Sequence, residues 1–365
     1  MHMRKSQLIV HQEYPFNAEP AGNLLRQSFL TPQQLFYVRC HGSIPVVDLA
    51  SYRLLVTGLV RRERELSLDE LRLLAPAHTV MATLECAGNR RKEFMAVKPI
   101  AGEVLWGAGV IGTANWRGIP LRNLLRAIGV QADARYVAFT GLDETQFEGE
   151  KGHFGSSIKL EKAFSPDVLL AYEMNGKPLA PEHGFPLRLL VPGYIGARSV
   201  KWLRQMTLQE SPSTNPYLAR DYKLFSSEIT AQTADWNRTK PIEDLNLNAV
   251  ITTPQEGETR VAGPIRIQGY AISNERTPVE RVELSVDGGK TWTTTSIVER
   301  ADPYAWCFWE VTITLAPGDY RLVVRAWDTS KQTQPEDVRT VWNFKGYMNN
   351  AWQRVNIHLA CSTVS

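Results

Sequence analysis

The sequence predicts an α+β domain followed by a β-sandwich, and three observations lead to this expectation. Residues 1–240 mix helical and strand patterns without the regular alternation of a doubly wound fold. From about residue 245 onward, short segments of alternating apolar and polar residues follow one another between turn residues. With 365 residues, of which 43% are hydrophobic and 22% charged, the chain is long enough for two domains with separate cores.

Two short helices are expected in the first domain. Residues 67–74 begin with Ser67, a good N-cap residue, and continue with acidic residues and then leucines at helical spacing. Residues 120–129 begin with proline and end with glycine, an asymmetry typical of helices.

Three strands are expected in the same domain, at residues 79–84, 136–140 and 187–191. Each is rich in β-branched, aromatic or other apolar residues and is bounded by turn residues. The first is a short buried strand that leads directly to a polar turn.

The second domain contains alternating segments at residues 265–271, 282–286, 309–315 and 320–327. Residues 287–289 and 317–319 separate them and have the composition of hairpin turns. This spacing predicts a β-sandwich of about the size of an immunoglobulin-like domain.

Composition and charge argue against several classes of function. A net charge of +3 with dispersed basic residues gives no support for nucleic-acid binding, and no apolar stretch is long enough for a membrane span. The four cysteines form no CxxC pair, which argues against a zinc knuckle or an iron–sulfur cluster, and there is no CxxCH for covalent haem. Residues 1–11 lack the apolar core of a signal segment, so we expect a cytoplasmic protein, or a periplasmic one if a leader was removed.

Residues 85–91 are the most informative segment, because a cysteine lies in a Gly/Asn turn and two arginines follow it. A thiolate is a soft metal ligand, and Arg90 and Arg91 would lower the pKa of Cys86. A lone cysteine is also often a small buried apolar residue. The residues by themselves leave both interpretations open.

Residues 83–91 resemble the molybdenum-binding signature of the sulfite oxidase family. Four further parts of the chain fit the same family in the same order: residues 36–41, 170–176 with 183–188, 196–202, and 341–346 with 350–352. The resemblance runs from about residue 12 to about residue 358. It implies a molybdopterin-binding catalytic domain at residues 1–240 and an immunoglobulin-like β-sandwich dimerisation domain at residues 245–365.

The resemblance implies a molybdenum–molybdopterin cofactor with Cys86 as the metal ligand. The pterin and its phosphate would be held by Tyr37, Val38, Arg39, Cys40, His41, Asp143, His183, Arg188, Ser199, Val200 and Lys201. Taken singly, Asp143 and His183 suit turns and Arg188 could pair with a carboxylate. The family commonly has Asn where this chain has Cys40, so at this position a backbone contact to the cofactor is easier to expect than a side-chain contact.

The resemblance also implies a substrate site for an oxyanion. Arg39 and Arg91 match its anion-binding arginines, Trp106 its pocket wall and Tyr222 its active-site tyrosine. Lys345 stands where the family usually has Arg, which keeps the charge but loses the bidentate fork. Assimilatory nitrate reductases tend to have Asn in place of the tyrosine and Met in place of the third cation, so Tyr222 and Lys345 favour sulfite oxidation.

The implied activity is molybdenum-dependent oxidation of sulfite to sulfate by oxygen-atom transfer in a homodimer. Because no haem-binding segment is seen, the electrons would pass to oxygen or to an external carrier. Two alternatives stay open: a molybdenum reductase of nitrate or a sulfoxide, and a non-catalytic binding module built on the C-terminal sandwich.

Overall fold

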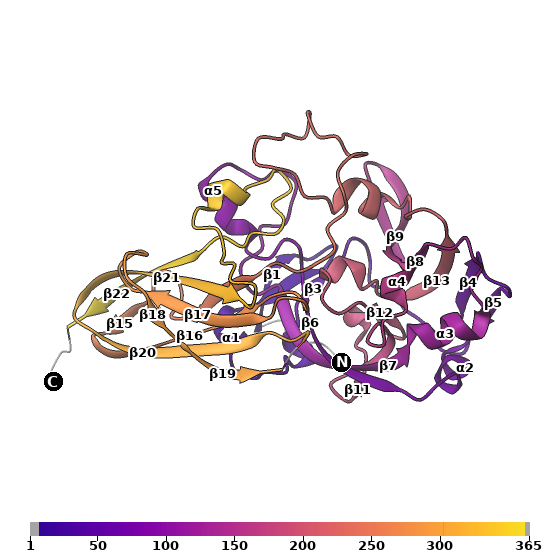
Figure 1. Ribbon diagram of the computed structural model, residues 1–365, viewed down its shortest axis with the longest axis horizontal. Coiled ribbons are helices and arrows are strands. Elements are labelled where there is room, and N and C mark those ends of the chain that lie inside the picture. Colours follow the sequence, from indigo (N-terminus) through magenta and orange to yellow (C-terminus); the bar gives the residue numbers. More distant parts are fainter. Residues whose placement is uncertain (1–6, 302, 362–365) are drawn as a thin grey trace.

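The structure is a computed structural model that describes residues 7–301 and 303–361, and it groups the strands of these residues into five sheets (Figure 1). Residues 1–6, on which the expectation of a missing signal segment partly rests, lie outside the described residues. Within the described ranges, none of the helices has both the length and the apolar character needed to cross a membrane.

A small antiparallel sheet lies at the start of the chain, in the order β1 (Leu8–Gln12), β2 (Asn17–Pro20) and β3 (Val38–Arg39). The helix α1 (Gly22–Leu25) and the 3₁₀ helix η2 (Gln33–Leu35) lie between β2 and β3. Pairing places Asn17 opposite Arg39, so this sheet fixes the backbone of the first predicted arginine.

The second sheet contains the strand that leads into the turn of Cys86. Its order is β11 (Lys177–Pro178), β10 (Leu169–Met174), β7 (Ile111–Pro120) and β6 (His78–Glu85), with β12 (Arg188–Leu190) paired to β10. The strand β6 pairs with β7 along its whole length, from His78 opposite Gly118 to Glu85 opposite Ile111. The predicted buried strand is therefore confirmed, and Cys86 follows its last residue.

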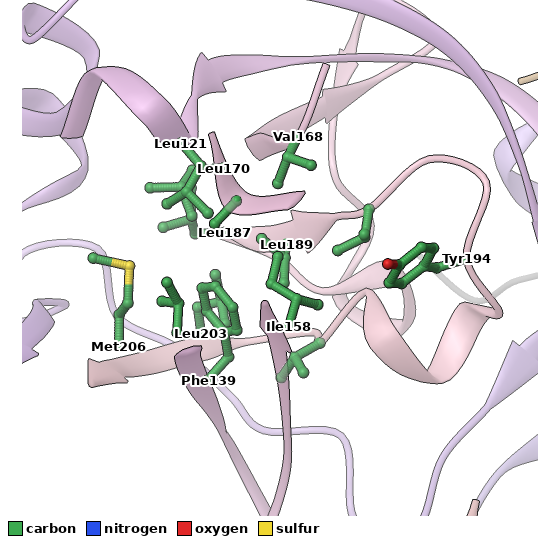
Figure 2. Packing of buried hydrophobic residues seen from close by; sticks show 14 of the residues in the cluster. Leu121, Phe139, Ile158, Val168, Leu170, Leu187, Leu189, Tyr194, Leu203 and Met206 are labelled. Atoms are coloured by element: carbon green, nitrogen blue, oxygen red, sulfur yellow. The ribbon is translucent and has the colours of Figure 1, made fainter. Parts of the chain in front are cut away.

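The third sheet has the order β5 (Arg64–Leu66), β4 (Leu54–Gly58), β13 (Leu203–Gln209), β8 (Tyr136–Phe147) and β9 (Glu150–Lys159). Leucines and other apolar side chains from the second and third sheets share one core, where Phe139, Leu170 and Leu203 pack together (Figure 2). This core supports the two strands, β10 and β12, that lie next to the site.

Both predicted helices of the first domain are confirmed. The helix α2 (Leu68–Leu73) has a complete capping box between Ser67 and Glu70. The helix α3 (Leu121–Ile128) buries its apolar side chains and ends at Gly129. The other short helices are α4 (Leu160–Ala163), α5 (Val338–Val341), η3 (Arg91–Ala96), η4 (Pro181–His183), η5 (Gly196–Arg198) and the π-helix η6 (Tyr217–Asp221).

The predicted β-sandwich is confirmed and consists of two sheets. One has the order β14 (Asn248–Thr253), β16 (Gly263–Ile272), β20 (Cys307–Leu315) and β19 (Ser296–Arg300). The other has the order β15 (Thr259–Val261), β22 (Gln353–Ala360), β21 (Gly318–Asp328), β17 (Val279–Ser285) and β18 (Thr293–Thr294). Figure 1 places these strands at the opposite end of the molecule from β4 and β5.

One of the two predicted hairpin turns is wrong. Residues 287–289 do join an antiparallel pair, β17 and β18. Residues 318 and 319 instead begin β21, and residues 316 and 317 carry the chain to it from β20 in the other sheet. Turn composition indicates that the chain reverses, but packing of the two sheets decides which strand each segment pairs with.

The C-terminal half of the chain also forms hydrogen bonds to the turn that contains Cys86, which we call the cysteine turn. The amide of Met348 donates to the carbonyl oxygen of Ala87 at 2.7 Å, and Asn89 Nδ2 donates to the hydroxyl of Tyr270 at 3.1 Å. The two halves of the chain therefore contact each other at the turn that contains Cys86.

Candidate active site

The turn that carries Cys86 is held by backbone hydrogen bonds and close packing. The Cys86 amide donates to the carbonyl oxygen of Val110 at 2.9 Å, and the amide of Asn89 closes the turn onto the carbonyl oxygen of Cys86. A Cβ atom at Gly88 would lie 2.8 Å from Nη2 of Arg91 and 3.0 Å from Cδ1 of Trp106. Glycine is needed at this position because the guanidinium and the indole close in on the backbone.

Of the two arginines expected beside the thiol, Arg90 is turned away. Its guanidinium binds the carboxylate of Glu93 at 2.7 Å and Oδ1 of Asn248 in the sandwich at 2.7 Å. Arg90 has a left-handed backbone, with φ at 64°, so its side chain leaves the turn in a different direction from that of Arg91. Its role is to join the two halves of the chain, and the expectation that it acts on Cys86 is wrong.

The expected low pKa of Cys86 is also not found in the protein without its cofactor. Burial raises the pKa of the Cys86 thiol, while Arg39, Arg91 and the Gly88 amide act in the opposite direction without outweighing it. A bound metal cation is the additional charge that deprotonates a coordinating thiol.

Cys86 faces a cavity of about 640 Å³, counting its mouth, which we call the inner cavity. Most of the predicted cofactor and substrate residues line it: Tyr37, Arg39, Cys40, His41, Asp143, His183, Arg188, Ser199, Lys201 and Tyr222. Two of the residues predicted to hold the cofactor, Val38 and Val200, do not line it. Val38 packs beside Cys40, and the carbonyl oxygen of Val200 accepts from the amide of Leu189 at 2.8 Å.

Two of the cations that line the inner cavity, Arg188 and Lys201, are held by backbone carbonyl oxygens. The guanidinium of Arg188 donates to the carbonyl oxygens of His183 and Ser199 at 2.9 and 3.0 Å, and Nζ of Lys201 donates to that of Glu182 at 2.9 Å. Within residues 7–301 and 303–361, no carboxylate forms an ion pair with Arg188 or Lys201. Burial lowers the pKa of Arg188 to about 10 and also lowers that of Lys201. Arg188 is buried, and a buried cation without an ion-pair partner is costly, so this cavity fits an anionic ligand.

Asp143 provides an unmatched acceptor in the same cavity. Its side chain is 3% exposed, and its buried Oδ1 atom has no hydrogen-bond partner among the described residues. Burial raises the pKa of Asp143 to about 6, against the opposing effect of Lys201. Such an orphaned oxygen is the expected position for a donor group of a bound pterin.

His183 is held by a backbone contact, as its position in a turn suggested. Its Nε2 donates to the carbonyl oxygen of Gln33 at 2.8 Å, and burial lowers its pKa to about 3. The imidazole is therefore neutral, and its other nitrogen is left as an acceptor.

Tyr222 and His41 form a buried pair in the wall of the inner cavity. The Tyr222 hydroxyl lies 3.0 Å from Nε2 of His41, and its ring stacks on Tyr347 at 5.3 Å. Burial, assisted by Arg39, lowers the pKa of His41 well below its ordinary value, and burial raises that of Tyr222. Both groups are therefore neutral, and the imidazole accepts from the phenol when its proton is on Nδ1.

Arg39 lies where the inner cavity meets a wider space outside it. Arg39 and His41 line both the inner cavity and this vestibule, which we define by Arg39, His41, Glu103, Asp221 and Lys345. Burial opposes the charge of Arg39, but nearby Tyr222 and Cys86 outweigh it and raise its pKa. The guanidinium is therefore charged at the passage between the two spaces.

Lys345, the predicted third cation, lies in the vestibule between two carboxylates. Its Nζ is 2.5 Å from Oε1 of Glu103 and 2.7 Å from Oδ1 of Asp221. Glu103 also reaches Nη1 of Arg91 at 3.2 Å, and Asp221 accepts from the hydroxyl of Tyr347 at 3.0 Å. Sequence reasoning missed both carboxylates and Tyr347. Asp221 precedes Tyr222 directly, but no local pattern indicates that it meets Lys345.

Trp106 does not form the pocket wall that was expected of it. It is fully buried and lines neither the inner cavity nor the vestibule. Its ring lies 4.9 Å from that of His11 in an edge-on arrangement and is next to Gly88. Trp106 therefore packs against Gly88 of the turn and against His11, which lines the vestibule.

A metal in this site would have few protein ligands. Among the described residues, no group of three or more His, Cys, Asp or Glu side chains is placed to hold a metal ion. Cys86 is a single soft donor next to an electropositive cavity, which fits a metal whose other ligands belong to an anionic cofactor.

Comparison with known proteins agrees with this geometry. Residues 41–217 match the oxidoreductase molybdopterin binding domain, and residues 239–360 match the Mo-co oxidoreductase dimerisation domain. The chain is 41% identical to a sulfite oxidase of Gallus gallus, over 95% of this chain and 77% of that protein. It is 38% identical to a sulfite oxidase of Arabidopsis thaliana, over 99% of this chain and 96% of that protein.

Two further similarities extend the comparison. A nitrate reductase of Phaseolus vulgaris is 39% identical over 95% of this chain, but the match covers only 42% of that longer protein. The sulfane dehydrogenase SoxCD of Paracoccus pantotrophus superposes with a TM-score of 0.79 at 27% identity, over 94% of this chain and 84% of that chain.

The fold and the site together define a molybdopterin-dependent oxidoreductase. The chain belongs to the sulfite oxidase family.

Proposed function

We propose that this protein oxidises sulfite to sulfate at a molybdenum–molybdopterin centre in the inner cavity. The observation that carries the proposal is the combination of one thiol, Cys86, with buried Arg188 and part-buried Lys201, whose hydrogen bonds go to backbone carbonyl oxygens. An anionic cofactor supplies both the missing negative charge and the remaining metal ligands.

The cofactor is held by the side chains that line the inner cavity. Arg188 and Lys201 bind its negative charge, Asp143 accepts from the pterin through its orphaned oxygen, and Cys86 ligates the molybdenum. Tyr37, Cys40, His183 and Ser199 complete the wall. When bound, the cofactor supplies the oxygen-atom transfer and takes up the electrons.

The substrate anion is bound on the side of the cavity that meets the vestibule. Arg39 carries a charged guanidinium at this passage, and Arg91 adds a second charge that acts on Cys86. Tyr222 stays a neutral phenol because burial raises its pKa, so it can turn its proton from His41 toward a bound oxyanion. These groups are in place before the substrate arrives, which is the arrangement that stabilises developing charge.

Two residues favour sulfite over nitrate as the substrate. Tyr222 lines the inner cavity and Lys345 lines the vestibule, where the related nitrate reductases tend to have an amide and a methionine. A phenol that donates and a nearby ammonium both suit a sulfur oxyanion with high charge density.

The sandwich at residues 245–365 is proposed to join two copies of the chain, in keeping with its match to a dimerisation domain. The electrons are proposed to leave for oxygen or for an external carrier such as a cytochrome.

Metal analysis and a kinetic screen test the proposal. Protein from a host that makes the cofactor is expected to contain about one molybdenum per chain and to oxidise sulfite with oxygen, ferricyanide or cytochrome c. The competing assay supplies nitrate or a sulfoxide with a chemically reduced dye. Turnover of nitrate or the sulfoxide without turnover of sulfite would contradict the proposal, and so would protein without molybdenum that still folds and binds sulfite.

A further inference from the structure

The vestibule holds an ion network whose carboxylate Glu103 has no part in the proposed reaction. Glu103 lies between two cations, with one oxygen 2.5 Å from Nζ of Lys345 and the other 3.2 Å from Nη1 of Arg91. The side chain of Glu103 is 13% exposed and that of Arg91 only 2%, so water screens this contact poorly.

Glu103 changes the charge that an entering anion meets. Arg39, Arg91 and Lys345 would together present three positive charges, but Glu103 and Asp221 offset two of them. Burial opposes the charge of Lys345, yet Asp221 and Glu103 raise its pKa, so this cation is charged and already paired. The negative charge of Glu103 adds to burial in raising the pKa of Cys86, and adds to Tyr222 and Cys86 in raising that of Arg39.

A substrate that is to use Lys345 or Arg91 must compete with Glu103 for their N–H donors. A carboxylate at 2.5 Å from an ammonium is a strong, charge-assisted partner. The competition lowers the affinity for any anion, and it lowers it more for a dianion, because the repulsion by Glu103 scales with the ligand charge.

We propose that Glu103 is a specificity-determining residue that lowers the affinity of the site for dianions such as sulfate, relative to monoanions, by holding Lys345 and Arg91 in its own ion network. The inference rests on the proposed function in one respect, because sulfate is the product there. In that reaction Glu103 favours product release and limits inhibition by sulfate in the surroundings.

Equilibrium binding of inorganic sulfate and of chloride to the cofactor-loaded protein tests the proposal without turnover. Glu103→Gln keeps the size of the side chain and removes its charge. We expect it to tighten sulfate binding about tenfold and chloride binding about threefold, since the same change in site charge acts on two ligand charges or on one. The KM for sulfite should fall while kcat falls or stays constant as product release slows.

The matched control is Glu148→Gln. Glu148 lines the same vestibule, but its carboxylate pairs with Arg220 at 2.8 Å and its side chain is 57% exposed. We expect less than a twofold change in sulfate binding, because solvent screens an exposed charge. Glu103→Asp, which keeps the charge, should bind sulfate more nearly like the unaltered protein, and Glu103→Ala serves as a second neutral variant if Glu103→Gln folds poorly.

A double variant shows whether Glu103 acts through Lys345. In a Lys345→Met background, Glu103→Gln should tighten sulfate binding by less than half as much on a logarithmic scale. An equal effect in both backgrounds, or equal effects of Glu103→Gln and Glu148→Gln, would overturn the proposal. Protein that binds sulfate as expected but does not oxidise sulfite would contradict the proposed function and leave this inference standing.

Discussion

The hydroxyl of Tyr222 lies 3.0 Å from Nε2 of His41, and both side chains line the cavity that Cys86 faces. Burial lowers the pKa of His41 well below its ordinary value and raises that of Tyr222. The two groups therefore stay neutral across the neutral pH range.

Removing this hydroxyl should slow the reaction without unfolding the protein. We expect Tyr222→Phe to lower kcat/KM for sulfite about 10- to 100-fold, the loss of one hydrogen bond to a charged group. The pH profile of the unaltered enzyme should show no ionisation of this pair between about pH 6.5 and 10, because both pKa values lie outside that range. A kcat/KM for Tyr222→Phe within twofold of the unaltered value would show that the phenol does not contact the reacting anion.

Cys86→Ser should abolish sulfite oxidation and leave the chain folded, because a hard hydroxyl is a poor replacement for a soft thiolate on molybdenum. The measurements are molybdenum content, turnover and circular dichroism. Cys361→Ser is the matched control, since Cys361 is an exposed cysteine far along the chain. Near-normal activity of Cys86→Ser would refute its assignment as the metal ligand.

Asp143 should make the stability of the cofactor-free protein depend on pH. Its folded-state pKa of about 6 lies above its ordinary value of 3.8, so the folded state binds more protons than the unfolded state between these pH values. The free energy of unfolding should therefore fall as pH rises from about 4 to 6, by about 3 kcal/mol in all, and stay lower at pH 7.

Asp143→Asn has no charge to bury and should lack this contribution. Denaturant unfolding at a series of pH values measures it, with Asp133→Asn at an exposed position as the control. Identical pH dependence in Asp143→Asn and the unaltered protein would rule out the buried carboxylate as its source. In the loaded enzyme, Asp143→Asn should lower the cofactor content.

Lys345→Met should raise KM for sulfite, because it leaves Glu103 and Asp221 without their shared cation. The net charge of the vestibule then becomes more negative. The expected cost is about 1–3 kcal/mol, and nitrate should become relatively more favourable as a substrate. Lys345→Arg keeps the charge and offers two N–H donors in one plane to an oxyanion. The KM of this variant for sulfite should therefore equal the unaltered value or fall below it. Unchanged KM in both variants would place Lys345 outside the path of the substrate.

Removing the residues after 245 should give insoluble protein. Tyr270, Trp306 and Phe308 from the sandwich belong to the same buried cluster as the core of the catalytic part, so truncation exposes a large apolar surface. The solubility and the light-scattering mass of the truncated chain check this. A soluble truncated chain with the mass of the full-length assembly would show that the sandwich is needed neither for the core nor for association.

The sequence by itself determined the local elements and the identity of the chemistry. The capping box at Ser67, the strand that ends before Cys86 and the alternating strands of the sandwich follow from periodicity and turn chemistry, which act over a few residues. The ordered family motifs predicted the cavity residues, from Tyr37 to Tyr222, that the structure brings together.

Only the tertiary structure decided which side chains act on one another. In the folded chain, Arg90 binds Asn248 of the sandwich, Trp106 is buried next to the turn that contains Cys86, and burial raises the pKa of Cys86. It also joined Lys345 to Glu103, although 242 residues separate them along the chain. Burial and long-range charge pairing depend on how distant segments pack, and no pattern of neighbouring residues contains that information.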